Sequence, residues 1–112
     1  MGRWVLALCL AGCGPIAYVG QVSRDAASKV QHAKELEADK YSPYWYTRAK
    51  VYLHMAREVA AHADYQGANR FGRLASEAAD KAAVEAEVAA KDPSKRPENP
   101  TKELAPAKED VP

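Results

Sequence analysis

A long proline-free, alanine-rich stretch limits the possible folds of this chain more than any other feature. No proline occurs between Pro43 and Pro93, and glycine is nearly absent from the same stretch. Ala, Leu, Glu, Lys and Arg are strong helix formers, so this composition predicts an all-α fold. Because an alanine methyl group buries little apolar area, we expect tethering, a partner or self-association to help stabilise such a small domain.

The apolar residues of the first half recur every three or four positions, which predicts one narrow stripe on an amphipathic helix. This helix is expected to begin either at Ile16 or at Ser23, where Ser23 would be the N-cap, and to end at Lys40. The stripe consists of small and branched residues: Val19, Val22, Ala26, Val30, Ala33 and Leu36.

Two further helices follow. The second is expected to begin with Ser42 as N-cap and Pro43 at the first helical position, and the third with Asp64 as N-cap. The short connection between them predicts an antiparallel hairpin, either alone or as part of a three-helix bundle. The apolar stripe of the third helix consists of Phe71 and of an alanine ladder: Ala68, Ala75, Ala78, Ala79, Ala82, Ala86 and Ala89.

The N-terminus has the layout of a secretory signal. Arg3 precedes an apolar run from Trp4 to Leu10, and small residues follow. The run is shorter than the roughly 20 apolar residues that a spanning helix needs, so a transmembrane anchor is the weaker interpretation. Two structural roles are possible for Cys13. Its thiol could be buried, or it could form a disulfide with Cys9.

The four residues Leu10-Ala11-Gly12-Cys13 resemble the lipobox of bacterial lipoproteins. The resemblance implies cleavage before Cys13, a diacylglycerol on its thiol and an acyl chain, such as palmitate, on its new amino group. Gly14 stands where an Asp retains many lipoproteins in the inner membrane. The resemblance therefore implies the outer membrane, with the domain facing the periplasm.

The chain is thus expected to contain a signal peptide (residues 1–12), a tether (13–22), a helical domain (23–91) and a disordered tail (92–112). The tail is predicted from its prolines, which alternate with Lys and Glu and leave no apolar period.

The residue patterns of common active sites do not occur. The three histidines lack the spacing of a metal-ligand pair, the serines lack the glycines of a nucleophile elbow, and no glycine-rich phosphate loop exists. Acidic and basic residues alternate and the net charge is +1, which argues against nucleic acid. We therefore expect no enzyme, no metal, no cofactor except the lipid on Cys13, and no small-molecule substrate.

The aromatic residues Tyr44, Trp45 and Tyr46, together with Tyr41, form the one conspicuous cluster. Such rings could bind the sugars of a cell-wall glycan or anchor a partner. Alternatively, they fill the corner between the first two helices, and their position at that corner favours this second interpretation.

Residues 42–90 resemble a small alanine-rich helical domain of unknown function that is found in bacterial lipoproteins. The resemblance rests on Ser42-Pro43, on the alanine ladder and on the Asp64-Tyr65-x-x-Ala68 turn, which is also distantly similar to tetratricopeptide repeats. It implies a non-catalytic helical module and no site residues. The sequence therefore predicts a membrane-anchored envelope lipoprotein that binds itself or an envelope protein, with peptidoglycan binding through the aromatic cluster as the alternative.

Overall fold

A computed structural model describes residues 14–97, and this part of the chain is built from helices. In chain order the elements are α2 (Gly14–Glu35), α3 (Ala38–Tyr41), α4 (Pro43–Ala61), α5 (Tyr65–Lys91) and a short 3-10 helix, η1 (Pro93–Lys95). The all-α prediction is therefore confirmed.

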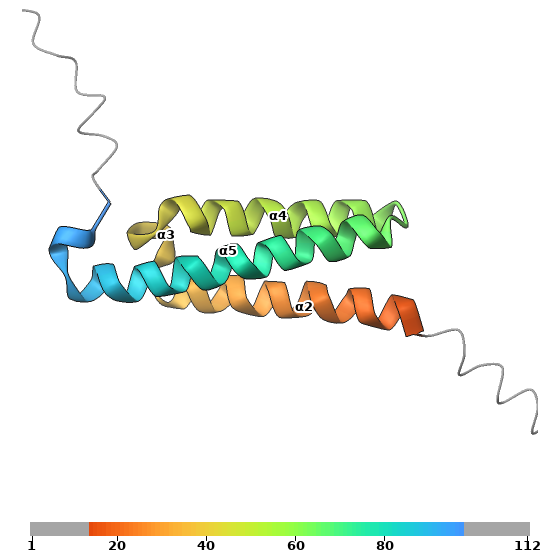
Figure 1. Cartoon of the computed structure of the whole chain (residues 1–112), viewed down its shortest axis with the longest axis horizontal. Helices are drawn as coiled ribbons and strands as arrows, with labels where there is room; N and C mark the ends of the chain where they lie inside the picture. The colour runs from red at the N-terminus through yellow and green to blue at the C-terminus, as the bar shows by residue number, and fades with distance from the viewer. Residues whose placement is uncertain (1–13, 98–112) are drawn as a thin grey trace, which may run out of the picture.

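The three long helices form an up-down-up bundle (Figure 1). Helix α4 runs antiparallel to α2 and α5, and α5 packs against both of them. The short helix α3 lies at one end of the bundle, and the α4–α5 turn lies at the other end beside the start of α2. Of the two architectures that the sequence predicted, the three-helix bundle is the one observed.

The core of the bundle consists mainly of alanine. The alanines of the predicted ladder on α5 are all buried, whereas Phe71 of the same stripe is half-buried. Among the buried apolar residues that the structure describes, only Val30, Tyr46 and Leu53 are larger than alanine. Gly72 marks a close approach of α5 to α2, because a Cβ at this position would lie 2.6 Å from Cγ1 of Val22. Small side chains thus let the helices approach closely, while each contact buries little apolar area.

The turn between α4 and α5 is closed by local hydrogen bonds. Ala63 adopts the left-handed conformation, with φ of 59°. The N–H groups of Ala63 and Asp64 donate to the carbonyls of Ala60 and Val59, which is the Schellman pattern of helix termination. The Asp64 carboxylate accepts a 2.9 Å hydrogen bond from the N–H of Gly67, so the predicted N-cap is confirmed.

The first helix has different limits from those expected. It begins at Gly14, so residues 14–22, which were assigned to a tether, belong to α2, and Ser23 lies within the helix rather than at its start. It ends at Glu35, short of Lys40, because Glu37 adopts the left-handed conformation with φ of 58°. The chain then resumes as the single turn α3.

The beginning of the expected tail is also structured. The Asp92 carboxylate accepts hydrogen bonds from the backbone N–H and the hydroxyl of Ser94, and these bonds lower its pKa. Arg96 donates from Nε to the carbonyl of Ala89, which turns η1 back toward the end of α5. The tail from residue 98 onward, the signal peptide and Cys13 lie outside the described residues.

None of the helices between residues 14 and 97 has both the length and the apolar character needed to cross a membrane.

Candidate functional site

The exposed large apolar side chains gather at the α3 end of the bundle. Five such residues occur in the described part of the chain, and three of them, Tyr44, Val84 and Val88, line the same open cavity. Their exposed fractions are 59%, 61% and 47%. Apolar side chains that are exposed next to one another make this part of the molecule the candidate site.

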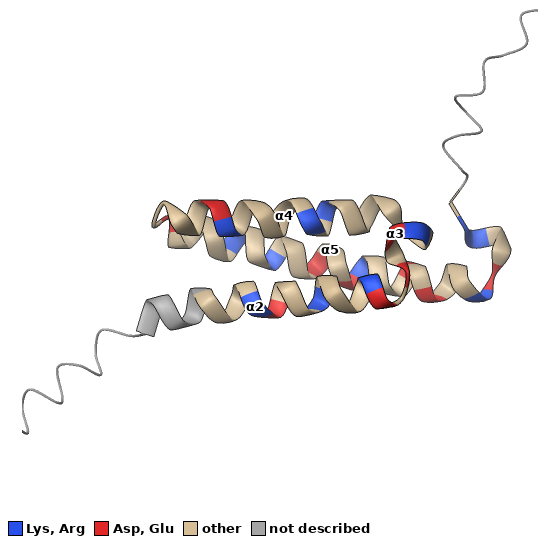
Figure 2. Ribbon diagram, turned by 180° about the vertical axis from the view of Figure 1, so that it is seen from behind, with Lys and Arg blue, Asp and Glu red and all other residues tan. Residues whose placement is uncertain are grey.

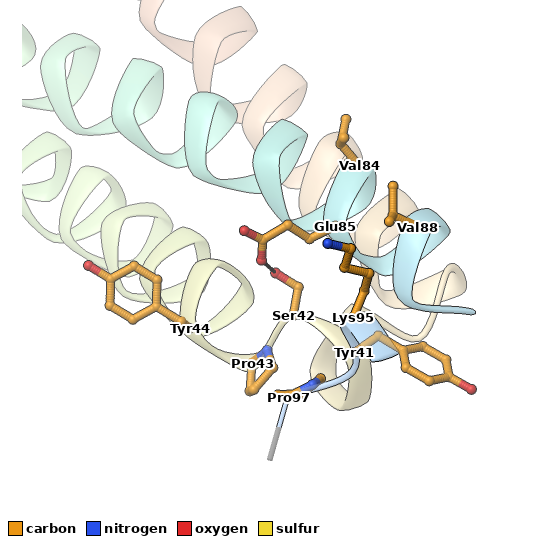
Figure 3. Close-up of a pocket in the computed structure, with 9 residues that line it drawn as sticks. All are labelled: Tyr41, Ser42, Pro43, Tyr44, Val84, Glu85, Val88, Lys95 and Pro97. Carbon is orange, nitrogen blue, oxygen red and sulfur yellow. Dashed lines mark hydrogen bonds between the residues drawn. The ribbon is translucent and has the colours of Figure 1, made fainter. Parts of the chain in front are cut away.

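The cavity has a volume of about 440 Å³ and is formed by three segments of the chain (Figure 3). Tyr41, Pro43 and Tyr44 come from the α3–α4 corner, Val84 and Val88 from α5, and Pro97 from the segment after η1. Glu85 reaches from α5 toward Ser42, and Lys95 extends across the cavity between these segments.

A polar clamp joins the α3–α4 corner to α5 beside this cavity. The buried Ser42 hydroxyl donates to Oε2 of Glu85 at 2.6 Å, and Nε1 of Trp45 donates to Oε1 at 3.1 Å. Ser42 occupies the predicted N-cap position of α4 and Pro43 the first helical position, but the Ser42 side chain makes no capping hydrogen bond. The Glu85 carboxylate binds the hydroxyl instead, so each of its oxygens has a donor.

The three predicted contact residues lie in different environments. Tyr46 is 8% exposed and belongs to the core, where it fills the corner between the helices. Trp45 is half-buried and packs against the same core, whereas Tyr44 is largely exposed and meets Trp45 edge to face, with ring centroids 5.0 Å apart. The cluster thus contributes both to packing and to the surface.

Arg48 and Tyr52 join this surface and were not identified from the sequence. Arg48 donates from Nη1 to the Tyr44 hydroxyl and from Nη2 to the Tyr52 hydroxyl, both at 2.6 Å. Its guanidinium carbon lies 5.4–5.5 Å from the ring centroids of Tyr44, Trp45 and Tyr52. The signal that could have found it is the spacing of four between Tyr44, Arg48 and Tyr52, which aligns the three side chains on one helix face.

The Arg48 guanidinium is held in its charged form. The hydrogen bond to Tyr52, followed by that to Tyr44, raises the pKa of Arg48 above its ordinary value. A second cation, Nζ of Lys81, lies 4.4 Å from the Trp45 ring centroid and 3.1 Å from the Glu77 carboxylate. Two cations thus lie against the rings of Tyr44, Trp45 and Tyr52, and Lys81 is paired with Glu77.

Charges of both signs occur on every helix labelled in Figure 2. One ion pair joins two helices, between Lys29 of α2 and Asp80 of α5 at 2.6 Å, and because both side chains are exposed it contributes little stability. Within residues 14–97, no three or more His, Cys, Asp or Glu side chains form a group that could hold a metal ion.

Comparisons of the chain with protein-family models, with curated proteins and with solved structures give no match.

Proposed function

We propose that this protein is a membrane-anchored lipoprotein of the bacterial cell envelope whose three-helix bundle acts as a binding module without catalysis. In this proposal the lipid on Cys13 holds the protein at the outer membrane with the bundle in the periplasm. The apolar cavity at the α3 end then receives an envelope protein or a second copy of the chain.

The position of α2 supports this arrangement. The structure describes α2 from Gly14 onward, so a lipid on Cys13 would lie at the end of the bundle where α2 starts. At 1.5 Å per residue, the 22 residues of α2 span roughly 33 Å. Helix α3 lies at the opposite end of the bundle from the start of α2 (Figure 1), and the cavity is lined by residues of the α3–α4 corner, so an anchored bundle would present the cavity away from the membrane.

The observation that carries the binding function is the concentration of exposed apolar side chains around the cavity. The other two exposed large apolar residues, Val51 and Tyr65, do not line this cavity, whereas Tyr44, Val84 and Val88 line it together and remain in contact with solvent. A covering partner would remove this apolar surface from water, which stabilises the complex.

The anchor is tested by the intact mass and the membrane partitioning of the full-length protein expressed in a bacterium. Loss of the leader and a gain of acyl mass are expected for the unmodified sequence and for Cys9→Ala, which is the matched control. Cys13→Ala should remain unacylated and leave the membrane fraction. An unmodified mass and a soluble protein in all three cases would overturn the anchor.

Peptidoglycan binding through Tyr44, Trp45 and Tyr46 is the second candidate function, and the exposure of the Tyr44 ring favours it. Tyr46 would then support the surface from the core. Sedimentation of the bundle with insoluble peptidoglycan tests this function. Retention should fall for Tyr44→Ala and Trp45→Ala but not for Val51→Ala, an exposed position elsewhere on α4. Absence of retention, or equal retention of all variants, would exclude it.

A further inference from the structure

Within residues 14–97, Arg48 is a positioned cation without an anionic partner. It donates hydrogen bonds to the hydroxyls of Tyr44 and Tyr52, and none of the ion pairs in the described part of the chain includes it. A guanidinium binds a carboxylate more strongly than it binds a hydroxyl, because both partners are then charged and can form two parallel hydrogen bonds. The exposed side chain can therefore accept an anion from solution.

The two tyrosines extend this donor character. Each hydroxyl oxygen accepts a hydrogen bond from Arg48, so the hydroxyl hydrogen is directed elsewhere and can be donated to a ligand. The surface formed by Tyr44, Arg48 and Tyr52 consequently offers N–H and O–H donors around one positive charge. Its complement is a singly charged ligand that is rich in acceptor oxygens.

The exposed Tyr44 ring adds an apolar contact beside these donors. The Arg48 guanidinium lies over the Tyr44 ring, 5.4 Å from its centroid, and Tyr44 keeps 59% of its surface exposed, so a ligand that contacts the exposed part of the ring lies next to Arg48. A pyranose ring has apolar C–H faces and oxygen acceptors at its edge, which suits an aromatic ring flanked by donors.

We propose that Tyr44, Arg48 and Tyr52 form a binding site for a sugar ring that carries a carboxylate. The carboxylate accepts hydrogen bonds from Arg48, the hydroxyl of Tyr52 donates to the ligand, and the sugar ring lies against Tyr44. This proposal rests on the second candidate function, for which it names the ligand class and the residue that discriminates between sugars.

N-acetylmuramic acid and N-acetylglucosamine form a matched pair of probes, because they differ by one lactyl group that carries the carboxylate. Titration of the bundle, followed by amide chemical shifts and by Trp45 fluorescence, should give binding of the acid and about tenfold weaker binding of the neutral sugar. Arg48→Gln should abolish this difference, and Tyr52→Phe should reduce it. Arg57→Gln, an exposed arginine on the same helix, should leave it unchanged.

Circular dichroism of each variant confirms that the bundle is intact. Glucuronic acid distinguishes the source of the carboxylate: binding of both acids supports recognition of sugar acids in general, and binding of N-acetylmuramic acid alone supports recognition of the cell-wall sugar. Equal binding of the acid and the neutral sugar would overturn the role of Arg48 while leaving glycan binding intact. Retention on peptidoglycan without any response to the acid would also overturn the proposal, and loss of both would overturn glycan binding itself.

Discussion

The two corners of this bundle are closed in different ways. At the α4–α5 turn, every hydrogen bond joins residues no more than five positions apart, from Val59 to Gly67. At the α3–α4 corner, backbone hydrogen bonds such as that from Ser42 to Ala38 are also local, but the side-chain hydrogen bonds reach from Ser42 and Trp45 to Glu85, 43 and 40 positions along the chain. The first corner is closed by its own segment alone, whereas the second is completed by a carboxylate of α5.

This difference predicts how each corner responds to damage. A change at the local turn should weaken the ends of two helices and leave the remaining contacts intact. A change at the α3–α4 corner should be felt by the whole bundle, because the polar clamp holds α5 against the start of α4. The same clamp also borders the apolar cavity, so the stability of this corner and the shape of the cavity depend on one carboxylate.

The largest effect is expected from overpacking the alanine ladder of α5. Ala75 and Ala82 are both fully buried, Ala75 nearer the local turn and Ala82 nearer the clamp. Replacement of Ala82 by Leu should lower the free energy of unfolding by about 3 kcal/mol, and Ala75→Leu should lower it by less. The difference is expected because a leucine at position 82 displaces α5 close to Glu85 and so also strains the hydrogen bonds of Glu85. Urea unfolding followed by circular dichroism measures both. Equal losses would show that the two corners do not differ in this respect.

Removal of the clamp carboxylate should have the next largest effect. Glu85→Ala leaves the buried Ser42 hydroxyl without an acceptor, at a cost of about 2 kcal/mol in the free energy of unfolding. The exposed Glu87 is the matched control, and Glu87→Ala should cost no more than about 0.5 kcal/mol.

A double-mutant cycle isolates the clamp from other effects of these substitutions. The variant that carries both Ser42→Ala and Glu85→Ala has no buried hydroxyl that needs an acceptor. Its loss in free energy of unfolding should therefore be smaller than the sum of the losses of the two single variants. Strict additivity would show that the hydrogen bond between Ser42 and Glu85 contributes nothing to stability.

A substitution at the α4–α5 turn should lower the free energy of unfolding by less. Asp64→Ala removes the N-cap of α5 and should cost about 1 kcal/mol, while Asp64→Ser should keep most of the stability. Native-state hydrogen exchange should place the loss in the first turn of α5. Faster exchange along all of α5, equal to that in Glu85→Ala, would contradict the contrast between the corners.

The smallest effect is a gain in stability at the same turn. The left-handed backbone of Ala63 is sterically unfavourable for alanine, whereas glycine adopts this conformation freely. Glycine loses more entropy on folding, so Ala63→Gly should raise the free energy of unfolding by only about 0.5 kcal/mol. Glu37→Gly makes the same change at the junction of α2 and α3 and should give a similar gain in thermal unfolding experiments. A loss in either variant would mean that the side chain contributes more than the backbone cost.

Sequence reasoning succeeded where the determining interactions are local. The start of α4 at Pro43, the Asp64 cap and the alanine ladder follow from spacing and from the preferences of single residues. The end of α2 could not be predicted in this way, because a left-handed residue is usually signalled by glycine and Glu37 stands there instead. The partner of the Ser42 hydroxyl lies on another helix, and spacing along α4 carries no information about Glu85.

The candidate site was predicted in part for the same reason. The aromatic cluster is conspicuous in the sequence. Which of its rings is buried depends on which face of α4 packs against the other helices, so the buried Tyr46 and the exposed Tyr44 could not be distinguished. Arg48 was overlooked because a single arginine among many charges carries no signal without its tyrosine neighbours. Whether Cys13 carries a lipid stays a prediction.

The alanine core also has a calorimetric consequence. The heat-capacity increase on unfolding comes from newly exposed apolar area and is reduced by newly exposed polar backbone. When a core of alanine methyl groups unfolds, little apolar area and much polar backbone become exposed. The increase per residue should therefore lie below the usual value of about 12–15 cal/mol/K, and the free energy of unfolding should change only gradually with temperature around its maximum. Such a bundle would resist cold and moderate heat about equally, with a low but nearly constant margin of stability.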